Sequence, residues 1–392
     1  MNRRLLFLVT EDWYFWSHRL PIARSARDEG IGVLIAARTN KHKERIEKEG
    51  FRLIPIGLKR KSKNIIKEIY SILEIIRIYR KEKPDIVHHV AIKPILYGSF
   101  AAWIAGVPYV VNALTGLGFI FIKKGWLASA IRKLIVFIYR LAFLSENTFA
   151  IFQNPEDLKL FIDLYIVKNN RAVLIRGSGV DTAHFLNLPE PAGIPVITLA
   201  SRMLWDKGIK ELVDATRQLH NNGVKCRTVL VGIPDPDNPA SIPEHVLRDW
   251  HAEGIVEWWG YRSDIADVFA RSNIVALPSY REGLPKVLLE AASCGRSIVA
   301  TDVPGCREIV RNNINGFLVP PYDSKSLVVA LKILIKNSKL RARMGASSRE
   351  IVIAEFSEEI VVKQTMELYE RINPQLRRRG LKASRKGAKT PR

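Results

Sequence analysis

Residues 278–295 read PSYREGLPKVLLEAASCG, and they follow a short apolar run, 273–277, that has the length of a buried strand. Pro285 suits the start of a helix and Gly295 suits the position just past its end, which delimits a helix of about ten residues. In an open parallel sheet, this helix start faces the carboxyl end of the strand, where ligands bind. Free N–H groups there favour a phosphate, and Gly283, which lacks a Cβ, lets an anion approach the backbone.

Short apolar runs alternate with stretches of helical period on both sides of this motif. The runs lack polar alternation, as in strands of a parallel sheet that is covered on both faces by helices. The order indicates two α/β domains, which the length of 392 residues also favours. The expected strands include 5–9, 32–36, 85–88 and 108–111 in the first half, and 196–200, 228–231, 273–277 and 297–300 in the second.

Three prolines and a glycine lie within residues 187–195, which we interpret as the linker between the domains. We therefore expect an N-terminal Rossmann-like domain over 1–186 and a C-terminal Rossmann-like domain over 196–354. A final helix within 355–374 is expected to pack back toward the N-terminal domain. Residues 375–392 contain 8 Lys and Arg, no Asp or Glu and almost nothing apolar, so we expect a basic, disordered tail.

The formal net charge of +22 is unevenly distributed. Residues 1–186 hold 30 Lys and Arg against 16 Asp and Glu, whereas residues 187–374 hold 23 against 23. A basic first half and a basic tail indicate an anionic partner, which is either a lipid surface or a nucleic acid. The sequence contains no helix-turn-helix, zinc finger or strand motif of interleaved aromatic and basic residues, so we expect no nucleic-acid partner.

The cysteines and the apolar segments indicate the compartment in which the protein is expected. The 3 cysteines lack metal-ligand spacing, which argues against a disulfide framework or zinc site and favours a reducing compartment. Glu11 and Asp12 cut the first apolar run short, so that run indicates a strand rather than a signal peptide. The apolar stretch 131–144 contains basic residues and is shorter than the roughly 20 residues that a spanning helix needs. We therefore expect a cytoplasmic chain without a spanning segment.

A second element, SRMLWDKG over 201–208, again lies between an expected strand and an expected helix. Arg202 and Lys207 are candidate cations of a diphosphate site, because fixed Arg and Lys donors can neutralise a departing diphosphate without a metal. Glu282 and Glu290 add two carboxylates that can border the same ligand. Taken singly, the four residues also fit ordinary surface cations, a helix cap and a solvated helix charge.

Together these elements resemble family 4 glycosyltransferases, whose GT-B fold places two Rossmann-like domains across a cleft. The matching residues are Arg202 and Lys207 in the family's Arg-x4-Lys-Gly element and Glu282 and Glu290 in its Glu-x7-Glu element. The resemblance is strongest over about 198–317 and traceable over 4–186. It implies a retaining, metal-independent transfer from a nucleoside diphosphate sugar, with a UDP-sugar as the expected donor and no cofactor.

The resemblance also implies roles for individual donor-side residues. Arg202 and Lys207 hold the diphosphate, and Glu290 binds the ribose hydroxyls. Glu282 lies near the reacting carbon of the donor sugar, with a positional and electrostatic role, since the acceptor attacks the face from which the leaving group departs. The remaining expected donor contacts are the backbone amides of Gly283 and Leu284, and Tyr261, in the loop 260–262 against the base.

The acceptor side is expected in the first half. Its loop 10–21 is aromatic and charged, with Ser17 as a possible N-cap, and it lacks the Gly-Gly pair common in the family. With 88–94 and 112–118, it is similar to the bacterial subgroup that assembles polysaccharides on polyprenyl diphosphate carriers. Many members have a histidine where 112–118 has none, so His18 and His88 are substitutes unless they are structural. The acceptor-side candidates are His18, His88, Lys93, Asn112, Thr115 and Gly116.

An expected helix over 126–144 has two different faces. The aliphatic face suits the domain core, and the basic face with aromatics suits the head groups of an anionic membrane, although ordinary solvated charges fit the same pattern. The basic cluster 59–63 indicates the same partner, so we expect a peripheral enzyme on the inner face of the membrane. The aliphatic face comprises Leu127, Ile131, Leu134, Ile138 and Leu141, and the opposite face Lys133, Arg140, Trp126 and Phe137.

The expected acceptor is a lipid-linked sugar, and alternatives to the glycosyltransferase function itself follow from the same patterns. A nucleotide-sugar epimerase or a phosphorylase shares the architecture, and the basic first half leaves a nucleic-acid-binding protein as a second alternative. Asp235, Pro236 and Asp237 resemble an Asp-x-Asp metal site, but they stand among prolines in a loop. A turn is the simpler interpretation, so no metal is expected.

Overall fold

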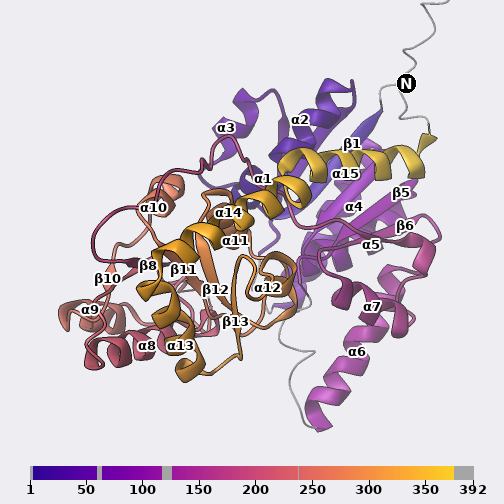
Figure 1. Ribbon diagram of the computed structural model, residues 1–392. Coiled ribbons are helices and arrows are strands. Elements are labelled where there is room, and N and C mark those ends of the chain that lie inside the picture. The colour runs from indigo at the N-terminus through magenta and orange to yellow at the C-terminus, as the bar shows by residue number, and fades with distance from the viewer. Residues whose placement is uncertain (1–2, 60–63, 117–125, 237, 375–392) are drawn as a thin grey trace, which may run out of the picture.

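The computed structural model describes residues 3–59, 64–116, 126–236 and 238–374 (Figure 1). Within them, the chain forms two parallel sheets, of 7 strands in the order β3-β2-β1-β4-β5-β6-β7 and of 6 strands in the order β10-β9-β8-β11-β12-β13. Both orders reverse beside a central strand, as in doubly wound sheets. The expected class of two Rossmann-like α/β units is confirmed. Residues 60–63, 117–118 and 375–392 and Asp237, on which some expectations fall, lie outside the described residues.

The first sheet is built around β1, whose Phe7 lies opposite Ile35 of β2 and His88 of β4. The inner residues of β1 and β2 are covered on both faces, which explains their unbroken apolar sequence. The strands are β1 (Arg4–Glu11), β2 (Gly32–Arg38), β3 (Arg52–Pro55), β4 (Ile86–Val90), β5 (Tyr109–Ala113), β6 (Thr148–Phe152) and β7 (Ala172–Leu174). The helices are α1 (Asp12–His18), α2 (Leu20–Asp28), α3 (Lys43–Lys48), α4 (Ile65–Glu82), α5 (Ile92–Ala105), α6 (Trp126–Ala142), α7 (Pro155–Asp163) and the 3-10 turn η2 (Asn169–Arg171).

The second sheet repeats the scheme. Helix α11 spans Lys286–Ser293, with Pro285 as its N-cap and Gly295, which has φ 67°, two residues past its end. The expected ends of this helix therefore hold to within one or two residues. The strands are β8 (Val196–Ala200), β9 (Arg227–Val231), β10 (Glu257–Trp258), β11 (Ile274–Leu277), β12 (Ser297–Thr301) and β13 (Gly316–Val319). The helices are η3 (Trp205–Lys207), α8 (Ile209–Asn221), α9 (Glu244–Ala252), α10 (Ile265–Ala270), α11 (Lys286–Ser293), α12 (Pro304–Ile309), α13 (Ser324–Lys336) and α14 (Ser338–Glu355).

The last helix, α15 (Glu358–Ile372), crosses back to the first half, as the yellow ribbon in Figure 1 shows. Its Val361 and Tyr369 are buried in the same core as Phe7 of β1. The crossing lies beside the segment that leads into the second half: Val180 N donates to Phe356 O (3.0 Å) and Glu358 N donates to Val180 O (3.1 Å). Two adjacent segments therefore connect the halves.

The expected N-cap at Ser17 is wrong. Ser17 lies in the last turn of α1, where its hydroxyl donates to Trp13 O (2.9 Å), and α2 starts only at Leu20 with Pro21 in its first turn. The proline fixes a helical φ, so it marks the new start without a side-chain cap.

The expected orientation of α6 is also wrong. The helix packs against the domain through the side of its surface next to the aliphatic face. On that side Tyr139, and Phe143 just after the helix, contact the ring of Phe161 in α7. Aromatic contacts with α7 thus set the rotation of the helix. As a result, the aliphatic side chains Ile131, Leu134, Ile138 and Leu141 are exposed rather than buried. In the part of the chain that the structure describes, no helix is long and apolar enough to cross a membrane.

Candidate active site

The two motifs of the second half meet at the carboxyl edge of its sheet. Lys207, in η3 after β8, places Nζ 2.5 Å from Oε1 of Glu282, in the loop after β11. Gly208 makes this approach possible: it has φ 68°, and a Cβ there would lie 2.0 Å from Pro278 O. The structure therefore brings the Arg-x4-Lys and Glu-x7-Glu elements together.

The other cation of the first motif, Arg202, pairs with Asp235, a residue that the sequence indicates as part of a turn. Its Nη1 lies 2.6 Å from Oδ2 of Asp235, in the proline-containing loop after β9. The same loop holds the backbone of the motif, since Trp205 N donates to Ala240 O (2.8 Å). The sequence contains one signal for the role of Asp235: its loop follows an expected strand of the second sheet, so it lies at the same edge as the two motifs.

Glu290 lies one and a half turns inside α11, and its surroundings change its acidity. Burial is the main cause that raises the pKa of its carboxyl to about 7; the charge of Lys286 opposes this rise and the charge of Glu358 adds to it. Lys286 also reaches the first half, where its Nζ donates to Ser17 O (2.6 Å). Near neutral pH, Glu290 can thus both donate and accept hydrogen bonds, which suits a ligand with hydroxyl groups.

Gly283 is one point at which the two halves touch. A Cβ on this residue would lie 2.3 Å from Thr115 O, and the same loop of the first half brings Gly116 against Gly283 Cα. Asn154 of the first half donates through Nδ2 to Gly283 O (3.1 Å). Nearby, Nε of Arg176 lies 3.0 Å from Oε2 of Glu308 across the same boundary. The loop after Glu282 therefore faces the loop that carries Thr115 and Gly116.

The two histidine candidates are held differently. His18 stacks on Tyr14, with ring centroids 4.2 Å apart, and burial, followed by the charges of Lys286 and Arg19, lowers its pKa well below the ordinary value. His88 is buried within β4, where Nδ1 lies 2.5 Å from the hydroxyl of Tyr369. Both side chains are therefore neutral near pH 7.

The remaining acceptor-side candidates are not all in the cleft. Asn112 is fully buried, and its Oδ1 lies 2.8 Å from Nδ1 of His89, so the structure places it inside the first half, beneath the site. Lys93 Nζ donates to Oε1 of Glu68 (2.8 Å) at the outer rim of the same sheet edge. Of the acceptor-side candidates, Thr115 and Gly116 lie nearest the donor motif.

Tyr261 lies at the opposite border of the donor side. Its side chain is exposed, and the loop that carries it is tied to the end of β9, where Gly232 N donates to Gly260 O (2.7 Å). An exposed ring at this edge is available to stack on a flat ligand group.

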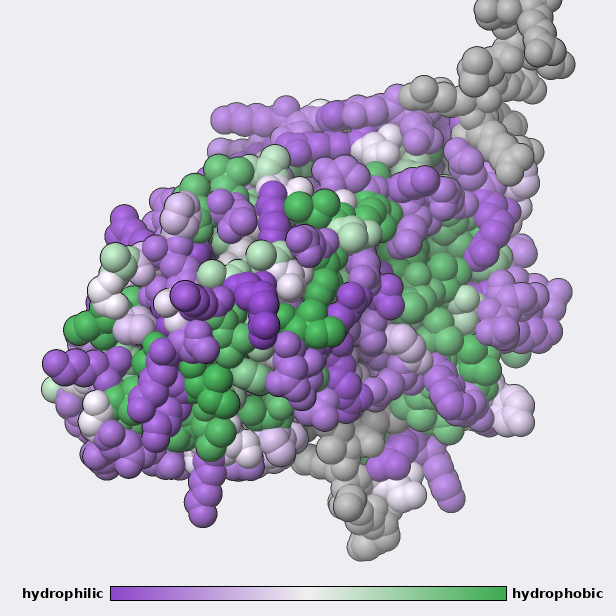
Figure 2. All heavy atoms as spheres, viewed as in Figure 1, coloured by the Kyte–Doolittle hydropathy of each residue, from purple (hydrophilic) through white to green (hydrophobic). Residues whose placement is uncertain are grey.

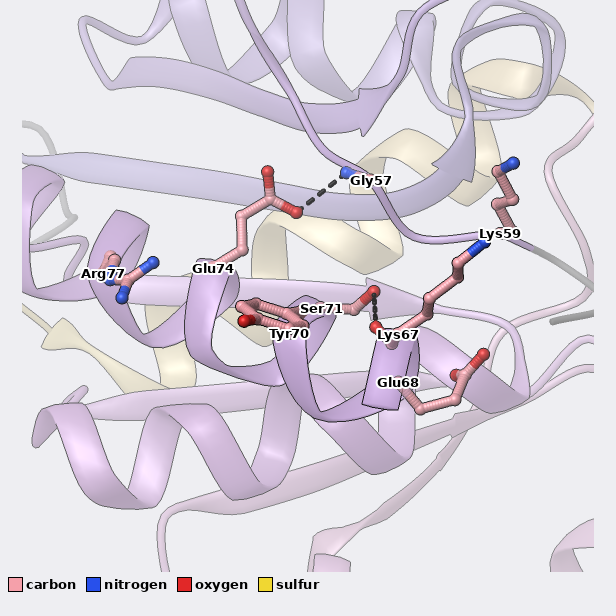
Figure 3. A pocket seen from close by; sticks show the side chains of 8 residues that line it. All are labelled: Gly57, Lys59, Lys67, Glu68, Tyr70, Ser71, Glu74 and Arg77. Carbon is pink, nitrogen blue, oxygen red and sulfur yellow. Dashed lines mark hydrogen bonds between the residues drawn. The ribbon is translucent and has the colours of Figure 1, made fainter. Parts of the chain in front are cut away.

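A cavity of about 380 Å³ lies outside the cleft, and only residues of the first half line it (Figure 3). It opens on the outer side of α4, where Glu74 accepts a hydrogen bond from Gly57 N (2.8 Å). Lys59, Lys67 and Arg77 line it and form no ion pair with any described residue. Its position away from the two motifs separates it from the candidate active site.

Comparisons with known proteins agree with this geometry. Residues 182–351 match the family described as glycosyl transferases group 1, and residues 4–154 match the family described as glycosyl transferase 4-like. The chain belongs to the group 1 glycosyltransferases. This glycosyltransferase is 26% identical over 385 residues to the N,N'-diacetylbacillosaminyl-diphospho-undecaprenol alpha-1,3-N-acetylgalactosaminyltransferase of Campylobacter jejuni, a match that covers 94% of this chain and 99% of the relative.

Further similarities concern a second relative and the fold. The UDP-Gal:alpha-D-GlcNAc-diphosphoundecaprenol alpha-1,3-galactosyltransferase of Escherichia coli is 25% identical over 318 residues, covering 78% of this chain and 80% of the relative. The crystal structure of HepE from Anabaena in complex with UDP and glucose aligns with a TM-score of 0.73 at 19% identity, covering 94% of this chain and 100% of that one. Sucrose-phosphate synthase from Thermosynechococcus elongatus aligns with a TM-score of 0.77 at 18% identity, covering 95% and 100%. The GT-B fold is thereby confirmed.

Proposed function

We propose that this glycosyltransferase moves a sugar from a UDP-sugar to a lipid-linked glycan acceptor that carries a diphosphate, in the synthesis of a cell-surface polysaccharide. The observation that carries the proposal is the contact of Lys207 with Glu282 directly beside Gly283, where the first half touches the second. Two relatives named after diphospho-undecaprenol acceptors, and the UDP complex of a protein with the same fold, support this choice of substrates.

The donor diphosphate would lie between Arg202 and Lys207. In the structure, each cation is paired with a carboxylate, Arg202 with Asp235 and Lys207 with Glu282. A carboxylate and a phosphate offer similar oxygen geometry to Arg and Lys, so these side chains mark where the diphosphate oxygens would lie. Neutralising the charge of the leaving group with two fixed cations would need no metal.

With the diphosphate bound to Lys207, the carboxylate of Glu282 would turn from Lys207 to the donor sugar. In this position its negative charge stabilises positive charge that develops at the reacting carbon, while Gly283 and Leu284 present backbone groups. The acceptor hydroxyl would enter from the side of Thr115 and Gly116 and attack the same face that the diphosphate leaves, with retention of configuration. A diphosphate oxygen would take the proton of that hydroxyl.

The acceptor lipid would place the first half against an anionic membrane surface. The first turns of α4 carry the exposed side chains Ile65, Ile66 and Ile69. The same part of the helix carries Lys67, which lines the cavity together with Lys59 (Figure 3). Apolar side chains next to cations suit the boundary between head groups and acyl chains. Figure 2 shows further apolar surface over this half in green. Together with α4, the membrane face would include Ile131, Leu134, Phe137, Ile138, Leu141 and Leu144 on and after α6.

A screen of UDP-, GDP- and ADP-sugars for thermal stabilisation tests the donor. We expect a UDP-sugar to raise the Tm of the wild type and to lose most of this effect with Arg202→Ala, because a ligand stabilises only the state that binds it. Transfer of radiolabelled sugar to a synthetic diphosphate-linked acceptor then tests the reaction. Consumption of the donor without any acceptor would instead support an epimerase, and stabilisation by no nucleotide sugar would contradict the proposal.

A further inference from the structure

A second, much smaller cavity lies in the first half, beside its contact with the second half. It has a volume of about 10 Å³, which is room for one water-sized atom. Arg19, His88, Gln153 and Gly177 contribute to its lining, and none of the lining residues is Asp or Glu. The cavity is close to the donor loop, since a Cβ at Gly177 would lie 2.6 Å from Leu284 Cδ2 and a Cβ at Gly283 would lie 3.2 Å from the amide oxygen of Gln153.

Arg19 is a buried cation with no counter-ion among the residues that the structure describes. Its side chain is only 3% exposed, and its Nε has no acceptor. Among the described residues, its side chain donates one hydrogen bond, from Nη1 to His18 O at 3.2 Å, and forms no ion pair. A buried charge that lacks a partner is costly, and an anion bound beside it would remove that cost.

His88 offers a second donor to the same cavity. The hydroxyl of Tyr369 has His88 Nδ1 as its hydrogen-bond partner among the described residues, and burial raises the pKa of Tyr369, so the phenol keeps its proton and donates it to Nδ1. Burial and then the charge of Arg19 lower the pKa of His88, so the ring is neutral and its one proton is on Nε2. This Nε2 is buried and has no acceptor. An oxygen in the cavity would meet two N–H donors.

We propose that Arg19 and His88 form an anion site in which one oxygen of the acceptor's phosphate occupies the water-sized cavity. The proposal rests on the proposed function and names the group of the acceptor that the first half recognises. In an acceptor that carries a single diphosphate-linked sugar, the first phosphate is one sugar ring away from the attacking hydroxyl, so a cation beside Gly283 and Leu284 is well placed to bind it. The donor diphosphate has its own cations, Arg202 and Lys207, in the other half.

The test compares two acceptors that carry the same sugar, one linked to a lipid diphosphate and one linked to an uncharged alkyl chain. For Arg19→Met, we expect kcat/KM for the diphosphate acceptor to fall by about tenfold or more, because a charge-assisted hydrogen bond is lost. For the uncharged acceptor, kcat/KM should change by less than about threefold. Arg19→Lys keeps the charge and should recover part of the loss. Arg24→Met, which removes an exposed cation of α2, serves as the matched control.

A binding measurement separates the anion site from the proposed reaction. With saturating UDP present to occupy the donor side, inorganic diphosphate should bind to the wild type and to Arg24→Met but not to Arg19→Met. This result does not depend on transfer to either acceptor. An equal loss of activity on both acceptors, or unchanged diphosphate binding by a folded Arg19→Met variant, would show that Arg19 has only a structural role and would overturn the proposal. The Tm of Arg19→Met without ligand should not fall, since the variant removes an unpaired buried charge.

Discussion

The guanidinium of Arg202 and the carboxylate of Asp235 lie 2.6 Å apart and join the loops that follow β8 and β9. Asp235 is thus already paired with Arg202, the cation that we assign to the donor diphosphate. Any anion that binds there must share Arg202 with Asp235 or displace it.

Asp235→Asn should therefore strengthen donor binding. The amide keeps a hydrogen-bonding oxygen for Arg202 but removes a negative charge next to the incoming diphosphate, so the KM for the donor should fall by about three- to tenfold. Steady-state kinetics with varied donor measures this change. Glu257→Gln, which neutralises the exposed partner of Arg227 in the same half, should leave the donor KM unchanged. A higher donor KM for Asp235→Asn would show that Asp235 orients Arg202 instead of competing for it.

Gly283→Ala should abolish most of the transfer while leaving donor binding largely intact. The added Cβ would lie 2.3 Å from Thr115 O, so the two loops must separate, and a shift of this size costs about 100-fold in kcat/KM. Activity assays combined with thermal shifts by UDP check both parts. The control is Gly57→Ala, whose Cβ would meet only Glu74 at 3.4 Å. Full activity of Gly283→Ala would contradict the close approach of the halves at this residue.

The acidity of Glu290 should appear in the pH dependence of stability. Because its pKa is about 7 when folded and near 4.5 when unfolded, its contribution is fully present below pH 4.5 and is lost as the pH rises through 7. Between pH 4.5 and 8, the wild type should therefore lose about 2 kcal/mol of unfolding free energy relative to Glu290→Gln. Urea denaturation at both pH values gives this difference. Glu367→Gln, at an exposed position on α15, should follow the wild type, and parallel pH profiles of wild type and Glu290→Gln would rule the effect out.

The proposed membrane face can be tested with vesicles. The double variant Leu134→Glu, Leu141→Glu should lose sedimentation with vesicles that contain anionic lipid, because charged groups replace apolar area at the acyl boundary. Val329→Glu with Ile333→Glu changes equally exposed side chains on α13 of the other half and should bind like the wild type. Loss of binding in both double variants would indicate that the apolar surface of α6 is not specific for the membrane.

Local signals in the sequence determined much of the fold. Pro285 and Gly295 delimit α11 because proline restricts φ at a helix start and glycine permits the positive φ that follows its end. The buried parallel strands were equally clear, since both of their faces are apolar. The same signals place Lys207 and Glu282 at one sheet edge, because the carboxyl ends of neighbouring parallel strands lie side by side.

Features that depend on tertiary packing could not be predicted from local sequence signals. The aliphatic side of α6 looked like a core face, but Tyr139 and Phe143 bind the ring of Phe161 and rotate that side into solvent. Asn112 has the right position in the chain for the cleft, yet it turns inward to His89. Asp235 looked like part of a turn because its partner, Arg202, is remote in sequence. Arg19 gave no signal, since its lack of a counter-ion is visible only in three dimensions.

The return of the chain to its first half has a consequence for biosynthesis. Helix α15 supplies Val361, Met366 and Tyr369 to the core that contains Phe7 and Phe15, and these residues are separated by almost the whole chain. A ribosome makes the amino-terminal half first, but the apolar surface of that half stays uncovered until the last helix has emerged. The nascent chain therefore exposes this surface throughout most of its translation, and chaperones that bind apolar segments have that interval in which to act.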